Sequence, residues 1–174
     1  MLFNALIFLS KENGTILSFY TACILHELGH IFAAFISKRK ITSIDFMGSG
    51  ICMILKKNAA SPVKQELFVL LSGPAFNLFI FAFCKSANLF PVFRTINLAL
   101  AVYNLLPYKQ LDGGSAISLF TLGASGERTA EKILTAVKLG FSAILFTLFI
   151  FKERALFPLF LISVILFISD HTKF

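Results

Sequence analysis

Two histidines and a glutamate form the pattern with the clearest chemical meaning in this sequence. His26, Glu27 and His30 belong to the run His-Glu-Leu-Gly-His. Side chains four residues apart lie on one face of a helix, about one turn from each other, so both imidazoles can bind the same Zn²⁺. In a zinc hydrolase with this pattern, the glutamate takes a proton from the attacking water and returns it to the leaving amine. The pattern predicts a hydrolytic zinc centre, with Gly29 leaving room beside the metal.

A zinc centre of this kind needs a third protein ligand, and Asp112 is the best candidate. It lies in the segment Asn-Leu-Leu-Pro-Tyr-Lys-Gln-Leu-Asp-Gly-Gly, directly before two glycines that let the backbone approach a metal closely. Taken alone, an Asp at such a place is more often a helix cap or a turn residue. The histidine pair reverses that preference. Cys23 lies on the same helix face as His26, but packing as a small apolar side chain is the preferred interpretation for it.

The composition is that of a protein that lies in a lipid bilayer. Of the 174 residues, 57% are hydrophobic and 14% charged, and the mean hydropathy of +0.82 is too high for an ordinary soluble domain. The net charge of +7 could suggest nucleic acid, but the basic residues lie in short clusters between apolar runs. We therefore expect no nucleic-acid partner. The three cysteines show no disulfide framework.

The pattern of apolar runs predicts an all-α polytopic membrane protein with about five transmembrane helices. The expected helices cover 15–37, 61–84, 88–106, 134–151 and 155–169, with a kink at Gly73-Pro74 and with Ser61-Pro62 as the start of the second. β-branched, aromatic and Gly residues predict a short membrane-associated β segment near 43–55. We expect a single domain over 1–174, with a core at 15–118 and C-terminal helices at 134–170. The apolar residues 1–10 are too few to cross a bilayer alone.

The membrane setting bears on the alternatives to a metal centre. Chance gives the histidine–glutamate pattern in well under about one such chain in a hundred. A neutral histidine pair can also form hydrogen bonds between helices without a metal. However, each ionisable side chain at mid-membrane costs roughly 2.5 to 3.5 kcal/mol even on the gentlest scale. Because three of them lie within about one and a half turns, a catalytic role is favoured.

With its histidine motif inside one span and its Leu-Asp-Gly-Gly motif closing a later one, the chain resembles the site-2 protease family of intramembrane zinc metalloproteases. The resemblance covers roughly 15–118 and implies that His26, His30 and Asp112 bind zinc and that Glu27 is the general base. It also implies roles for Asn77, in Gly-Pro-Ala-Phe-Asn, and for Asn104. An amide in a dry site can donate to an oxyanion or hold the substrate backbone. Hydrogen bonding between helices is the alternative for both.

The resemblance also implies a substrate and a location. The expected activity is hydrolysis of peptide bonds within or near transmembrane segments of membrane-tethered proteins, and the β segment would pair with an unwound substrate. The compact chain is similar to the bacterial sporulation-type branch of the family. Most of the 16 Lys and Arg residues lie in 38–64 and 109–138, which places these loops in the cytoplasm. We expect a multi-pass protein of the bacterial cell membrane, with its active site nearer the cytoplasmic side and with a regulatory membrane partner.

Two other functions remain as alternatives. A metal-binding membrane carrier would also place His and Asp inside the bilayer, because such residues mark ion pathways. A carrier would not need Glu27, and carriers usually show internal repeats, which this sequence lacks. An inactive homologue that binds membrane partners is the second alternative. The intact motifs around His26 and Asp112 argue against it.

Overall fold

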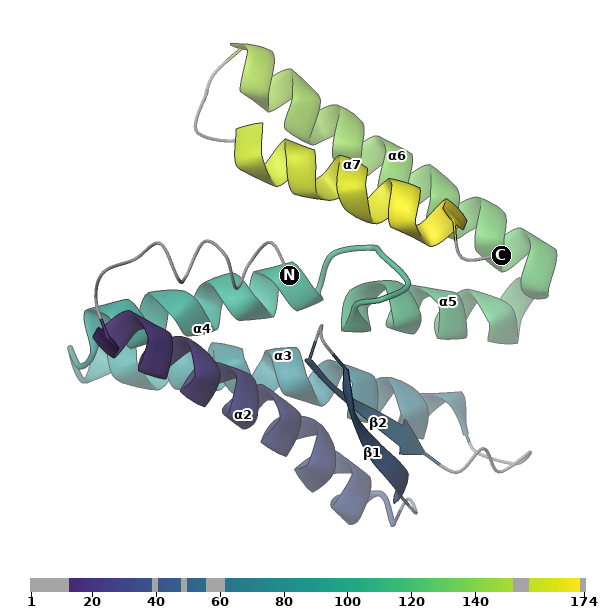
Figure 1. Cartoon of the computed structure of the whole chain (residues 1–174). Coiled ribbons are helices and arrows are strands. Elements are labelled where there is room, and N and C mark those ends of the chain that lie inside the picture. Colours follow the sequence, from purple (N-terminus) through teal and green to yellow (C-terminus); the bar gives the residue numbers. More distant parts are fainter. Residues whose placement is uncertain (1–12, 39–40, 48–49, 56–61, 152–156, 173–174) are drawn as a thin grey trace. The chain divides into compact units, whose positions relative to one another are not determined.

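The computed structural model describes residues 13–38, 41–47, 50–55, 62–151 and 157–172, and residues 1–10 lie outside this part (Figure 1). Its contacts divide the chain into two compact units, Met1–Asn104 and Leu105–Phe174. The single domain expected over 1–174 therefore stays a prediction. In chain order, the elements are α2 (Asn13–Ile36), β1 (Ile41–Met47), β2 (Gly50–Leu55), α3 (Val63–Ser86), α4 (Pro91–Asn104), α5 (Asp112–Ser125), α6 (Glu127–Phe151) and α7 (Phe157–Thr172).

The three helices of the first unit pack against one another in every pairing, and they lie side by side in Figure 1. On α2, the buried face carries small residues and the two histidines, whereas the opposite face exposes large apolar side chains. A soluble helix shows the reverse arrangement. Small and polar residues between helices, with apolar ones outside, are typical of helices packed in a membrane. The exposed side chains of α2 recur every three or four residues, at Leu17, Tyr20, Ile24, Leu28, Phe32 and Phe35.

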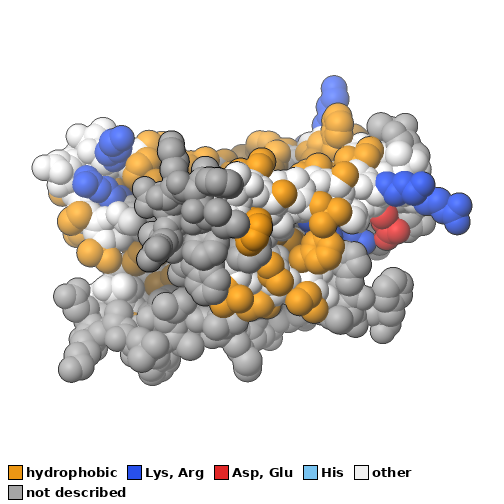
Figure 2. Space-filling model, turned by 90° about the horizontal axis from the view of Figure 1, so that it is seen from above, with side chains coloured by type: hydrophobic (Ala, Val, Ile, Leu, Met, Phe, Trp, Pro, Cys, Tyr) orange, Lys and Arg blue, Asp and Glu red, His pale blue; other side chains and the backbone are white. Residues whose placement is uncertain are grey.

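Two of the described helices, Gly14–Ile36 and Val63–Ser86, are long and apolar enough to cross a membrane. Hydrophobic side chains also cover much of the described surface in Figure 2. By contrast, α4 has 14 residues, and at about 1.5 Å per residue it is shorter than the roughly 30 Å of a hydrocarbon core. The expected count of five spans therefore stays a prediction.

The ends of α3 differ from those that the sequence predicts. Pro62 occupies the N-cap position and Val63 is the first helical residue, whereas Ser61 lies outside the described residues. Pro74 lies inside α3 without ending it, because packing against neighbouring helices compensates for a lost backbone hydrogen bond. At the C-terminal end, the Leu89 amide donates to the Cys84 carbonyl at 2.8 Å, and Asn88 has a φ of +53°. This is the closing pattern of a helix that ends in a left-handed residue.

The helix α4 starts later than the span predicted at 88–106. Both Asn88 and Phe90 have positive φ angles, of +53° and +44°, which a continuing right-handed helix excludes. Pro91 then begins α4, where its fixed φ and missing N–H suit the first helical position. The apolar run is therefore interrupted before the helix begins.

A β-hairpin lies between α2 and α3 in the chain, in the region where the sequence predicts a β segment. Strands β1 and β2 pair antiparallel, from Ile41 opposite Leu55 to Met47 opposite Gly50, with an irregularity between Ile41 and Ser43. Residues 48 and 49, between the two strands, lie outside the described part. The association of this hairpin with the membrane stays a prediction.

In the second unit, α5 packs against α6, and α6 packs against α7. The polar stretch before the apolar run at 134 is helical, because α6 already begins at Glu127. Gly126, with a φ of +79°, separates α5 from α6. A positive φ favours glycine, because a side chain would be strained there.

Candidate metal centre

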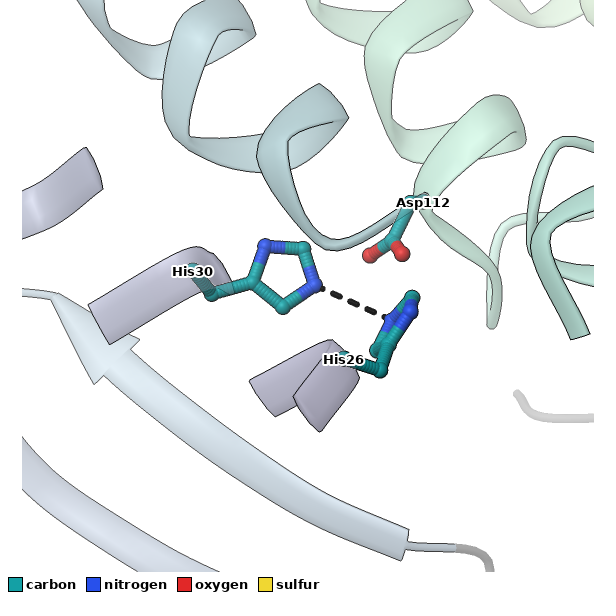
Figure 3. A group of neighbouring side chains, drawn as sticks. All are labelled: His26, His30 and Asp112. Carbon is teal, nitrogen blue, oxygen red and sulfur yellow. Dashed lines mark hydrogen bonds between the residues drawn. The ribbon is translucent and has the colours of Figure 1, made fainter. Parts of the chain in front are cut away.

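The two histidines of α2 face each other. His26 and His30 are 5% and 8% exposed, and their Nε2 atoms lie 3.2 Å apart. The imidazole planes are close to perpendicular, at 84°, with ring centroids 4.8 Å apart. Figure 3 shows this pair, with the dashed line between the two nitrogen atoms. The spacing of four residues has therefore brought the two rings together, as the sequence predicts.

The other nitrogen atom of each ring faces α3. His30 Nδ1 lies 2.7 Å from the backbone carbonyl of Val69, and His26 Nδ1 lies 3.1 Å from Oδ1 of Asn77. A carbonyl oxygen only accepts hydrogen bonds, so both rings carry their proton on Nδ1. The lone pairs are then on the two Nε2 atoms that face each other. Backbone and amide partners of this kind fix the tautomer of metal-binding histidines.

This arrangement fits a zinc ion. Zn–N bonds of about 2.0 to 2.1 Å at a tetrahedral angle separate two nitrogen ligands by about 3.3 Å, and the observed separation is 3.2 Å. A direct hydrogen bond between the rings would require an additional proton and would bury a charged imidazolium, which is unfavourable. A cation between the two Nε2 atoms could be bound by both rings. The residues present therefore suit the metal that the motif implies.

A glycine that the sequence analysis did not single out for this role lies against the imidazole pair. A Cβ atom placed on Gly73 would overlap Nε2 of His30 and lie 2.6 Å from its Cε1 and 2.9 Å from Cε1 of His26. Gly29, which the sequence suggested as the glycine beside the metal, instead faces the backbone of α3. A Cβ there would lie 2.8 Å from the Ser72 carbonyl oxygen. Gly29 thus allows α2 and α3 to approach, and Gly73 leaves space for the rings.

Asp112 belongs to the second unit, where it is the first residue of α5 and half-buried. Its two neighbouring glycines are required by the local fold. A Cβ on Gly113 would overlap the carbonyl of Leu105, and a Cβ on Gly114 would overlap that of Tyr108. The preceding loop therefore folds tightly against the first turn of α5. A carboxylate in this turn also interacts favourably with the helix dipole, which is the plainer role for Asp112.

His26 and His30 belong to the first unit and Asp112 to the second, and all three side chains are of types that can bind a metal ion. Two imidazoles and one carboxylate make up a donor set of the kind found in catalytic zinc sites. The geometry that supports zinc lies in the first unit, at the histidine pair. The role of Asp112 as the third ligand stays a prediction.

The remaining predicted site residues lie on α2, α3 and α4. Glu27 is half-buried, one residue after His26. Asn77 is fully buried and uses its oxygen on His26. Asn104 is the last residue of α4, and its amide donates to the Leu100 carbonyl of the same helix at 3.1 Å. These contacts agree with hydrogen bonding within and between helices, so the oxyanion roles of the two asparagines stay predictions. Cys23 is a free cysteine on α2.

Comparisons with known proteins agree with this fold and this chemistry. The chain is 28% identical over 137 residues to a candidate zinc metalloprotease of Synechocystis sp. (strain PCC 6803), covering 72% of this chain. It is 29% identical over 104 residues to the stage IV sporulation protein FB of Bacillus subtilis (strain 168), covering 55% of this chain. In each case, the match spans 36% of the relative's own length. No protein-family model matches.

The fold is similar to that of the site-2 protease of Methanocaldococcus jannaschii. The TM-score is 0.64 at 20% identity, and the match covers 99% of this chain and 86% of that protein. At this identity, the similarity shows a shared fold. The chain is therefore similar in sequence to a candidate zinc metalloprotease and a sporulation protein, and similar in fold to a site-2 protease.

Proposed function

We propose that this chain is an intramembrane zinc metalloprotease that hydrolyses peptide bonds within or near transmembrane segments of membrane-tethered proteins. The observation that carries the proposal is the histidine pair of α2. Its two Nε2 lone pairs converge at 3.2 Å, while both Nδ1 atoms are engaged by α3. In this proposal, Asp112 provides the third zinc ligand.

Each residue has a distinct part in the proposed reaction. Bound zinc supplies a Lewis acid that polarises the peptide carbonyl and acidifies water. Glu27 follows His26 directly on α2, and its carboxylate accepts the proton of the attacking water and delivers it to the leaving nitrogen. Asn104 and Asn77 are proposed to assist, either by donating to the developing oxyanion or by holding the substrate and ligands in place.

The proposed site lies inside the membrane, nearer its cytoplasmic face. His26 and His30 precede the last residue of α2, Ile36, by ten and six positions, which corresponds to about 15 and about 9 Å along the helix. The clusters of Lys and Arg that follow α2 support a cytoplasmic location for that end of the helix in this proposal. We propose a multi-pass protein of the bacterial cell membrane. In this proposal, a membrane partner regulates the access of substrate to the site.

The β-hairpin offers a way to present the substrate. A transmembrane helix seals its peptide bonds within its own hydrogen-bonded backbone, so it must unwind before hydrolysis. An extended segment can add to the edge of a sheet through main-chain hydrogen bonds. The antiparallel pair β1 and β2 provides such an edge, and we propose that the unwound substrate binds there.

A change in Glu27 separates hydrolysis from metal binding. We expect Glu27→Gln to lower cleavage by about 10² to 10⁴-fold, the usual contribution of a general base, while zinc remains bound. The measurement uses purified protein in lipid vesicles, a set of single-span membrane proteins tagged at both ends, and metal analysis of the same samples. Cleavage by the variant at the wild-type rate would remove Glu27 from the reaction.

A matched control uses the same substitution away from the histidines. Glu131 is exposed and pairs with Lys109 at 3.1 Å on the surface of the second unit. Surface ion pairs contribute about 0 to 1 kcal/mol, so we expect Glu131→Gln to keep both cleavage and zinc. A loss of cleavage in this control would show that the assay reports stability rather than chemistry.

A further inference from the structure

A second buried amide, Asn97 of α4, contacts Asn77, the residue that lies against His26. Asn97 is fully buried, and its Oδ1 accepts a hydrogen bond from Nδ2 of Asn77 at 3.1 Å. Its own amide nitrogen donates to the Phe93 carbonyl at 2.8 Å. A hydrogen-bonded chain thus runs from His26 on α2 through Asn77 on α3 to Asn97 on α4. All three residues belong to the first unit.

The orientation of the Asn77 amide decides the tautomer of His26. In the observed orientation, the amide oxygen faces His26, so the ring carries its proton on Nδ1. If the amide turned over, an N–H group would face Nδ1, and the proton of the ring would move to Nε2. A histidine protonated on Nε2 cannot bind a metal through that atom.

Two acceptors hold the Asn77 amide in the productive orientation. Its nitrogen donates to the Ala22 carbonyl at 3.3 Å and to Oδ1 of Asn97 at 3.1 Å. The Ala22 contact is the longer one and involves a single N–H. Without Asn97, the second N–H would lose this acceptor in an interior where an unsatisfied donor is unfavourable. The turned-over amide would then compete with the observed one.

We propose that Asn97 is a positioning residue for the metal centre, which sets the Nε2 lone pair of His26 by holding the amide of Asn77. This proposal rests on the proposed zinc site, but it concerns how the ligand is prepared. Residues that orient a metal ligand typically change metal affinity by about 10 to 100-fold when they are removed. Because Asn97 acts through Asn77, we expect its removal to fall at the lower end of this range.

The test is a double-mutant cycle read out as zinc affinity. Asn97→Leu removes the acceptor while keeping the number and branching of the side-chain heavy atoms, and Asn77→Leu removes the amide itself. Competition with a chromophoric chelator gives the zinc Kd of each detergent-purified protein. We expect Asn97→Leu to weaken binding by about tenfold and Asn77→Leu by about 10 to 100-fold. In the double variant, the loss should equal that of Asn77→Leu alone, because Asn97 then has nothing to position.

Two further variants separate positioning from packing. Asn97→Asp retains an oxygen that accepts from Asn77, so it should restore most of the affinity lost in Asn97→Leu. Thr95→Val removes an exposed hydrogen bond to the Pro91 carbonyl of the same helix and should leave the zinc Kd unchanged. If Asn97→Leu does not fold, Asn97→Ala replaces it in the cycle. Equal zinc affinity of the folded Asn97 variant and wild type, or additive losses in the double variant, would overturn the proposal.

A readout without metal distinguishes this proposal from the proposed function. The chain has three histidines, so ¹⁵N spectra of histidine-labelled protein resolve few signals. In metal-free wild type, we expect His26 to be protonated on Nδ1, and in Asn97→Leu we expect a share of the Nε2-protonated form. If wild type bound no zinc but showed this change, the metal centre would be wrong and the positioning role correct. Unchanged tautomers in the variant would refute the positioning role alone.

Discussion

Each unit of this protein contains a cluster of hydrogen-bonded side chains, and the two clusters differ in the chemical groups that form them. In the first unit, imidazole and amide groups form the chain from His26 to Asn97, in which every donor has a fixed direction. In the second, three hydroxyls bond to one another: Tyr108 to Ser163 at 2.7 Å, Ser142 to Ser163 at 2.7 Å, and Tyr108 to Ser142 at 3.4 Å.

The difference indicates which cluster can bind a ligand. Hydroxyl groups rotate and can both donate and accept, so the cluster of the second unit satisfies itself and joins α6, α7 and the loop before α5. In the first unit, the fixed amide and backbone partners direct two lone pairs towards one point. The proposed metal binding therefore involves the first cluster, and the second cluster joins elements of its own unit.

Of the substitutions beside these two clusters, we expect Gly73→Ala to have the largest effect on zinc binding. The added Cβ would overlap the His30 ring, and displacing a tightly packed group costs about 1 to 3 kcal/mol. Because the rings must move, the zinc Kd should rise by about 10 to 100-fold. Chelator competition measures this change.

The control for this variant is Gly140→Ala on α6, where a Cβ meets nothing within 4 Å. Alanine is the better helix former by about 0.8 to 1.0 kcal/mol, so this variant should be as stable as wild type or more stable, with the same zinc Kd. An unchanged zinc Kd in Gly73→Ala would mean that the rings are not confined as the structure shows.

A smaller effect is expected in the hydroxyl cluster. Tyr108→Phe removes one hydroxyl and leaves the 2.7 Å bond between Ser142 and Ser163. The free energy of unfolding should fall by about 1 kcal/mol, the usual net value of such a hydrogen bond, while the zinc Kd stays within about twofold of wild type. Thermal unfolding in detergent and chelator competition measure the two quantities. A zinc Kd that rose as much as in Gly73→Ala would remove the distinction between the clusters.

The sequence predicts those parts of the fold that depend on local patterns. A motif of five residues inside an apolar run was enough to place His26 and His30 on one helix face, because helix geometry alone determines that relation. The β segment and the helix at 63–86 also follow from local composition. The helix α4 starts later than predicted, since left-handed residues at Asn88 and Phe90 interrupt an apolar run that hydropathy does not divide.

The contacts between helices could not be predicted in the same way. Gly73 and Asn97 are important only because α3 and α4 lie against α2. No spacing along the chain predicts which helices are neighbours. Asn97 did carry one signal that was missed: it is an amide in the middle of an apolar run. Such a residue requires a buried hydrogen-bond partner or a function.

The identity of the atoms that bind zinc tests the central claim most directly. X-ray absorption at the zinc edge of the purified wild-type protein reports the type, number and distance of the ligands. We expect one zinc per chain, with nitrogen and oxygen donors only at about 2.0 to 2.2 Å and with the outer-shell scattering of two imidazoles. A protein that retains no zinc, or whose zinc is bound through sulfur at about 2.3 Å, would contradict the assignment of the metal centre to His26 and His30.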